Sequence, residues 1–152
     1  MPKETLKDLI KFLGVFPEQT KETVLWLREY VWDQYPKTNE LIYDNYNAVS
    51  LGWSLTDKLS HLFCTIAIFR TNHSIHFGFY WGNEIADPEK LLLGEGKQYR
   101  YIIVKDKKGF PKTYMKKLIK EAYANSLGKL KDGKQQIFGK TITKSVSAKK
   151  RK

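Results

Sequence analysis

Residues 62–81 constrain the fold of this chain more than any other stretch of the sequence. They read LFCTIAIFR, then a polar break TNH, then SIHFGFYW, so two runs rich in β-branched and aromatic residues flank a short turn. This pattern predicts a β-hairpin. Alternation gives each strand one strongly apolar face, formed by Leu62, Cys64, Ile66 and Ile68 in the first strand and by Ile75, Phe77, Phe79 and Trp81 in the second. Because few of these side chains can remain in water, we expect the hairpin to form the centre of a sheet.

The segments around the hairpin predict the rest of the fold. Apolar residues at helical spacing predict a short helix over 3–13, a long helix over 18–35 that ends before Pro36, and a second long helix over 112–127. We further expect a helical turn over 39–43, two short strands within 44–56, a short helix beginning at Asp87 and Pro88, and a last strand over 98–105. This order indicates an α+β domain with an antiparallel sheet of about five strands, packed against N- and C-terminal helices.

Composition limits the class of protein. The chain has 152 residues, of which 41% are hydrophobic, and this is typical of one domain with a sizeable core. No apolar run approaches the ~20 residues that span a bilayer, and the N-terminus lacks the apolar core of a secretory signal. The single cysteine excludes an internal disulfide framework. We therefore expect a cytoplasmic protein without a membrane partner.

The positive charge is concentrated at the C-terminus. Residues 127–152 hold nine basic residues and one acid, a net charge of +8, so residues 1–126 carry only +3 of the total of +11. The segment is also rich in small polar residues, which is typical of disorder. We therefore expect a single domain over residues 1–128 and a basic, disordered tail over 129–152. The tail either solubilises the protein or binds nucleic acid through Lys149, Lys150, Arg151 and Lys152.

Catalytic signatures are weak throughout the sequence. Cys64 lies within an alternating apolar strand, which predicts a buried and unreactive thiol. The histidines, His61, His73 and His76, do not stand at a metal-ligand spacing, and the chain has no nucleophile-elbow motif. The glycine-rich run of residues 94–97 is too short for a phosphate-binding loop. These observations favour a binding or carrier protein over an enzyme.

Two groups of side chains remain as candidate binding sites. The first is an acidic stripe that the helix over 18–35 places within a narrow sector, formed by Glu18, Glu22, Glu29 and Asp33. Clustered carboxylates suit a hard cation, although a solvated helix face explains the same pattern. The second is an aromatic group on or beside the predicted strands, which would line a small-molecule groove. The groove would be lined by Trp53, Tyr80, Trp81, Tyr99 and Arg100, and Tyr101 lies beside it. With Arg70, Arg100 and Lys105 nearby, the same aromatics would alternatively form a platform for single-stranded nucleic acid, although the near-neutral charge of residues 1–126 argues against strong binding.

Three segments of the chain resemble the YdhG-like family of small bacterial proteins. They are NELIYDNYNA at 39–48, CTIAIFRTNHSIHFGFYWG at 64–82 and DPEKLLLGEGKQYRYIIVKD at 87–106, within a match over roughly residues 20–126. The resemblance implies a compact α+β domain with helices packed on a curved antiparallel sheet. Most members have no assigned function, and one branch has been proposed to act as a frataxin-like intracellular iron chaperone. For this chain that implies Fe²⁺ binding by the acidic stripe and transfer to iron-accepting proteins.

Overall fold

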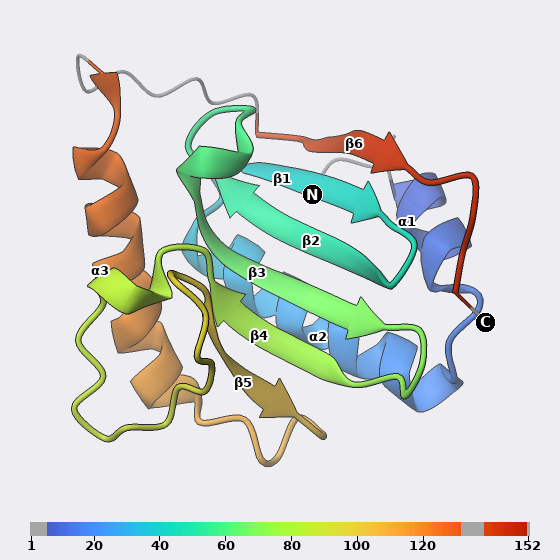
Figure 1. Cartoon of the computed structure of the whole chain (residues 1–152), viewed down its shortest axis with the longest axis horizontal. Coiled ribbons are helices and arrows are strands. Elements are labelled where there is room, and N and C mark those ends of the chain that lie inside the picture. The colour runs from blue at the N-terminus through green and yellow to red at the C-terminus, as the bar shows by residue number, and fades with distance from the viewer. Residues whose placement is uncertain (1–5, 132–138, 152) are drawn as a thin grey trace.

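The chain adopts an α+β fold with three helices and a six-stranded sheet in the residues described by the computed structural model, 6–131 and 139–151 (Figure 1). The elements are α1 (Leu6–Leu13), α2 (Glu18–Gln34), β1 (Asn39–Asp44), β2 (Ala48–Ser54), β3 (Leu62–Phe69), β4 (Ile75–Phe79), β5 (Arg100–Val104), α3 (Lys112–Gly128) and β6 (Thr141–Val146). Two short 3-10 helices, Leu59–His61 and Gly82–Glu84, lie in the connections. The α+β class and the three main helices are therefore as the sequence predicts. The expected C-terminal position of α3 is wrong, because β6 follows this helix and makes it internal.

The sheet is built around the predicted hairpin. Its strand order is β5-β4-β3-β2-β1-β6, so β3 and β4 lie in the interior of the sheet. Every neighbouring pair is antiparallel except β6, which runs parallel to β1. The sheet is thus mostly antiparallel but has six strands instead of about five, and one of its edges is formed by the C-terminal segment.

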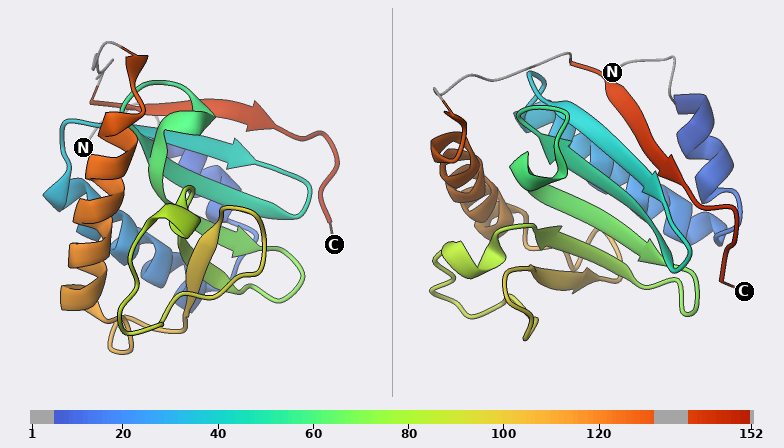
Figure 2. Two further views of the ribbon diagram at one scale, coloured as in Figure 1. Left: turned by 60° about the vertical axis from the view of Figure 1, so that its left-hand side comes forward. Right: turned by 45° about the horizontal axis from the view of Figure 1, so that its top comes forward.

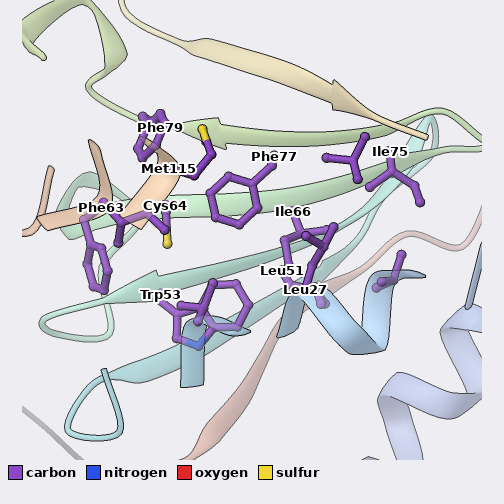
Figure 3. Close-up of a cluster of buried hydrophobic side chains, with 14 of the residues drawn as sticks. Leu27, Leu51, Trp53, Phe63, Cys64, Ile66, Ile75, Phe77, Phe79 and Met115 are labelled. Carbon is purple, nitrogen blue, oxygen red and sulfur yellow. The ribbon is translucent and has the colours of Figure 1, made fainter. Parts of the chain in front are cut away.

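One face of the sheet packs against the helices and forms the core. Ile66 pairs with Phe77 and Ile68 with Ile75, and all four side chains are buried in the same core cluster. Figure 3 shows Ile66, Ile75 and Phe77 within it. The predicted alternation fails at one point, because the register shifts between Trp53 and Ser54. The shift turns Phe63 toward the helices.

No helix among the described residues covers the opposite face of the sheet, and we call it the open face. In Figure 1, α2 lies behind the sheet and no helix lies in front of its central strands. Register and alternation place one row of side chains across it, Tyr43, Ser50, Ala67, His76 and Ile103, and a second row, Leu41, Gly52, Thr65, Gly78 and Tyr101. The register shift adds Leu62, whose side chain covers Gly52.

Each long helix buries one largely apolar face, and α2 also buries a charged residue, Arg28. In α2, Val24, Leu27 and Val31 are fully buried, and Arg28 and Trp32 are buried beside them. In α3 the buried face contains Met115, Leu118, Ile119, Ala122 and Ser126. Two further views show α3 beside one end of the strands and α1 near β6 (Figure 2).

Three local predictions are wrong. Residues 39–43 belong to strand β1 and do not form a helical turn, so the range 44–56 holds one strand, β2, instead of two. The chain after Asp87 does not form a helix either, although Asp87 accepts hydrogen bonds from the backbone N–H groups of Leu91 and Leu92 at 3.1 and 2.8 Å. The backbone leaves the helical region at Lys90, whose φ is +54°, and Leu93 forms a β-bridge with Tyr101. A bridge to the edge of the sheet thus replaces the short helix.

Candidate functional site

The basic C-terminal segment is folded against the sheet. Residues 141–146 form β6, and the chain beyond it follows the turn between β1 and β2. There the backbone N–H of Ser147 donates to the Asp44 carbonyl at 2.8 Å, and that of Arg151 donates to the Tyr46 carbonyl at 2.8 Å. The prediction that residues 129–152 are a disordered tail is therefore wrong for residues 139–151. Residues 132–138 and Lys152 lie outside the described residues.

A buried ion pair anchors β6 and β1 to α2. Arg28 and Glu40 are 1% and 0% exposed, and the guanidinium donates to both carboxylate oxygens at 2.7 Å. The Thr141 hydroxyl donates to the same carboxylate at 2.6 Å and accepts from Arg28 at 3.3 Å. A buried charge must be paired and hydrogen-bonded to be tolerated. The partners of this pair come from α2, β1 and β6, so these elements are held in one arrangement.

A second set of ion pairs fixes the tip of the segment at the end of the sheet. Asp44, at the end of β1, accepts from the guanidinium of Arg70 and from the ammonium of Lys150, the latter at 2.9 Å. Arg151 donates to the side-chain oxygen of Asn47 at 3.3 Å. Two cations therefore share the Asp44 carboxylate, and Arg151 adds a third positive charge nearby, which leaves this end of the sheet positively charged.

A cavity of about 360 Å³ opens among these cations, and we call it the basic pocket. It is lined by Val15, Phe16, Arg70, His73, Lys150 and Arg151. Its apolar wall comes from the connection between α1 and α2, where Phe16 packs edge-on against His73 with ring centroids 5.8 Å apart. Guanidinium and ammonium groups around a cavity are suited to a phosphate.

A row of aromatic rings lies on the open face, and we call it the aromatic row. His76 stacks on Tyr101 with ring centroids 4.2 Å apart and an interplanar angle of 3°. Phe69 packs against His76 at 4.6 Å, and Tyr99 stacks on Tyr101 at 5.7 Å. All four rings are partly exposed. Phe69 directly precedes Arg70 of the basic pocket, so the row and the pocket are adjacent in the chain.

Tyr99 is able to join the aromatic row because a glycine lies beneath its ring. The ring of Tyr99 lies over Gly78, where any added Cβ atom would overlap the ring and its hydroxyl group. From there the hydroxyl reaches Thr65 on the next strand, at 3.3 Å. Burial raises the pKa of Tyr99, and burial lowers the pKa of His76. His76 is therefore a neutral aromatic ring above its ordinary pKa of 6.5.

The predicted aromatic groove is only partly assembled. Tyr99 lies in the aromatic row, but Trp53 is fully buried on the helix side, where its ring meets Trp32 edge-on. Trp81 donates from its indole to the carbonyl of Ser60 at 2.9 Å, and the Lys129 ammonium lies 4.1 Å from the ring centroid.

The remaining groove residues also differ in their surroundings. Arg100 donates to the carbonyls of Gly96 and Tyr99 at 2.7 and 2.8 Å and so holds a turn together. Tyr80 is partly exposed and contacts Trp81 edge-on at 5.3 Å. The sequence analysis includes Tyr99 and Tyr101 among the candidate aromatics but misses Phe69 and His76 as their partners. Alternation along residues 62–81 already separates Phe69 and His76 from the core face, and this was the available signal.

The acidic stripe of α2 lies in solvent. Glu18, Glu22, Glu29 and Asp33 are all exposed, and Glu18 pairs with Lys21 at 3.0 Å. Within residues 6–131 and 139–151, no three His, Cys, Asp or Glu side chains lie close enough together to hold a metal ion. The stripe is thus a row of separate carboxylates in the described structure. Arg28, on the same helix, is buried against Glu40.

Two further observations concern reactivity and membranes. The Cys64 thiol is completely buried, as predicted, and burial raises its pKa well above the ordinary value. A neutral buried thiol is a poor nucleophile. None of the helices in the described part of the chain is long and apolar enough to cross a membrane.

Comparisons with known proteins found no match to this chain. No protein-family model, no curated protein and no solved structure matches it.

Proposed function

We propose that this protein binds single-stranded nucleic acid on the open face of its sheet. The aromatic row offers rings on which bases stack, and the basic pocket, whose Arg70 directly follows Phe69, offers cations for the phosphate backbone. The observation that carries the proposal is the docking of residues 147–151, which fixes Lys150 and Arg151 beside Arg70. A basic pocket that the folded domain holds in place is a different surface from a free basic tail.

Charge arithmetic supports the same proposal. The small net charge of residues 1–126 argues against a nucleic-acid surface only if the basic C-terminal residues do not pack on the domain. Five basic residues lie between 139 and 151, and β6 attaches them to the edge of the sheet. Fixed cations within a Debye length of ~10 Å act on the same phosphates.

Iron binding by the acidic stripe has less support. Tight binding of a hard cation requires several carboxylate oxygens to converge. The four acids are exposed along one helix, and one of them already pairs with a lysine.

Fluorescence anisotropy with a labelled single-stranded oligonucleotide tests the proposal. We expect Tyr101→Ala to weaken binding, because one lost stacking platform is worth ~1–3 kcal/mol. The matched control is Tyr46→Ala, which removes an exposed ring (47%) outside the aromatic row.

Salt dependence tests the basic pocket. Replacing Lys150 and Arg151 by Gln should reduce the slope of log K against log salt by ~1.4, since each phosphate contact contributes ~0.7 on single strands. The control, Lys116→Gln with Lys117→Gln, removes the same charge from α3. Equal slopes for the two double variants, or binding that does not depend on Tyr101, would refute the proposed site.

A further inference from the structure

A separate cavity of about 500 Å³ lies between α2 and α3, on the helix side of the sheet. It is lined by Asp33, Gln34 and Tyr35 from the end of α2 and by Lys116, Lys120 and Tyr123 from α3. The volume is that of a site for a small organic molecule. The two helices are joined next to it, because the Tyr30 hydroxyl donates to the Lys112 carbonyl at 2.6 Å.

The α3 wall of this cavity is cationic. Lys116 and Lys120 are four residues apart and therefore lie on the same side of the helix. Both side chains are exposed, and neither forms an ion pair within the part of the chain that the structure describes. Two unpaired ammonium groups facing one cavity favour a doubly charged anionic group such as a phosphate monoester.

The α2 wall offers hydrogen-bond acceptors. Asp33 contributes a carboxylate that forms no ion pair with any residue described. Gln34 donates from its side-chain nitrogen to the Tyr30 carbonyl at 2.9 Å, which leaves its side-chain oxygen as an acceptor. Because a carboxylate repels a bare anion, this wall suits the hydroxyl groups of a ligand and disfavours a second phosphate.

Two tyrosines, Tyr35 and Tyr123, line the cavity and are held in place by aromatic packing. Tyr35 and Tyr123 stack with ring centroids 4.9 Å apart, and Phe63 packs edge-on against both at 5.3 Å. Burial, with smaller contributions from neighbouring groups, raises the pKa of Tyr35 to about 12. Its hydroxyl group therefore stays protonated at neutral pH and is able to donate a hydrogen bond.

We propose that this cavity binds a phosphate monoester that carries free hydroxyl groups, with the phosphate at Lys116 and Lys120 and a hydroxyl group at Asp33. Sugar phosphates and nucleoside monophosphates both have this chemistry. The site shares no residue with the open face or the basic pocket. Tests of this cavity are therefore independent of tests of the proposed nucleic-acid binding.

Titration of the full chain followed by amide NMR signals tests this site with three probes: ribose 5-phosphate, adenosine monophosphate and inorganic phosphate. We expect saturable shifts at Asp33, Tyr35 and Tyr123, with both esters binding more tightly than inorganic phosphate. Tighter binding of the nucleotide would assign the site to nucleoside monophosphates, and equal binding of the two esters would assign it to the sugar phosphate that they share.

Matched variants identify the groups responsible. Lys116→Gln with Lys120→Gln should weaken ester binding about tenfold or more, whereas Lys117→Gln, on the neighbouring side of α3, should leave it unchanged. Asp33→Asn should reduce the ratio of ester affinity to inorganic-phosphate affinity. The control, Glu29→Gln, lies one turn earlier on α2 and should leave this ratio unchanged. The proposal is overturned if no probe gives a saturable shift, if inorganic phosphate binds as tightly as the esters, or if the paired lysine variant binds as the unmodified chain does.

Discussion

The buried pair of Arg28 and Glu40 makes the sharpest prediction about stability. Both side chains are almost completely inaccessible, and two hydrogen bonds of 2.7 Å join them. Replacing Glu40 by Leu leaves the guanidinium charge buried without its carboxylate. Replacing Arg28 by Met leaves a buried carboxylate without its cation. Breaking such a pair from either side costs ~3–5 kcal/mol, a large part of the 5–15 kcal/mol that a domain has available.

The double variant behaves differently, because neither charge is then left alone. Apolar replacements of both partners are close to neutral in buried pairs, and the further losses include the two hydrogen bonds that Thr141 forms with Glu40 and Arg28, worth ~1 kcal/mol each. We expect Arg28→Met with Glu40→Leu to unfold within ~2 kcal/mol of the unmodified chain. The coupling energy of the cycle is then ~3 kcal/mol or more.

Equilibrium unfolding in urea, monitored by tryptophan fluorescence, measures all four proteins of the cycle. The exposed pair of Glu18 and Lys21 is the control, and Glu18→Leu should change the unfolding free energy by less than ~1 kcal/mol. The reasoning is refuted if each single variant is as stable as the double variant, or if removing Glu40 costs no more than removing Glu18.

Three further outcomes test other parts of the structure. Gly78→Ala should cost ~1–3 kcal/mol in urea unfolding and shift the NMR signals of Tyr99, since the added methyl group overlaps that ring. Thr141→Val should cost ~1 kcal/mol by the same assay, through the lost hydrogen bond to Glu40, whereas a disordered tail would give no change. The folded state lowers the pKa of His76, so the unfolded state binds more protons and stability should fall as the pH drops below 6.5. His76→Phe should flatten that part of the profile of unfolding free energy against pH.

Strong periodicity was sufficient to predict the main elements. The helices over 18–35 and 112–127 and the hairpin over 62–81 have apolar patterns long enough to determine both their type and their buried face. These segments stabilise the fold chiefly through apolar burial, which a sequence records directly.

The C-terminal strand was missed because its stability comes from other sources. The β6 sequence TITKSV has few large apolar side chains, and every residue of the strand after Thr141 is partly or fully exposed. The strand is held by pairing with β1 and by the Thr141 contacts to Arg28 and Glu40. The hydrogen-bonding partners are about 100 residues apart in sequence, so no local pattern signals the contact.

The candidate site was predicted in part for the same reason. Tyr99 was selected as an aromatic beside a strand, but its position over Gly78 depends on the register between β4 and β5. Trp53 was placed in the same group because a strand within residues 44–56 does not by itself show which face meets the helices. Only the pairing of Trp53 with Cys64 places it in the core.

The docking of β6 also changes how the charge of this protein should be interpreted. A free basic tail would bind a polyanion through charge alone, with little dependence on the folded domain. In the folded chain, Lys150 and Arg151 lie at the basic pocket because residues 147–151 follow the β1–β2 turn. A ligand that contacts both the pocket and the aromatic row would bind the docked arrangement better than a detached one, and would therefore stabilise β6 against the sheet. Nucleic-acid binding and C-terminal docking are thermodynamically linked on this proposal, and a tail that acted alone would have no such linkage.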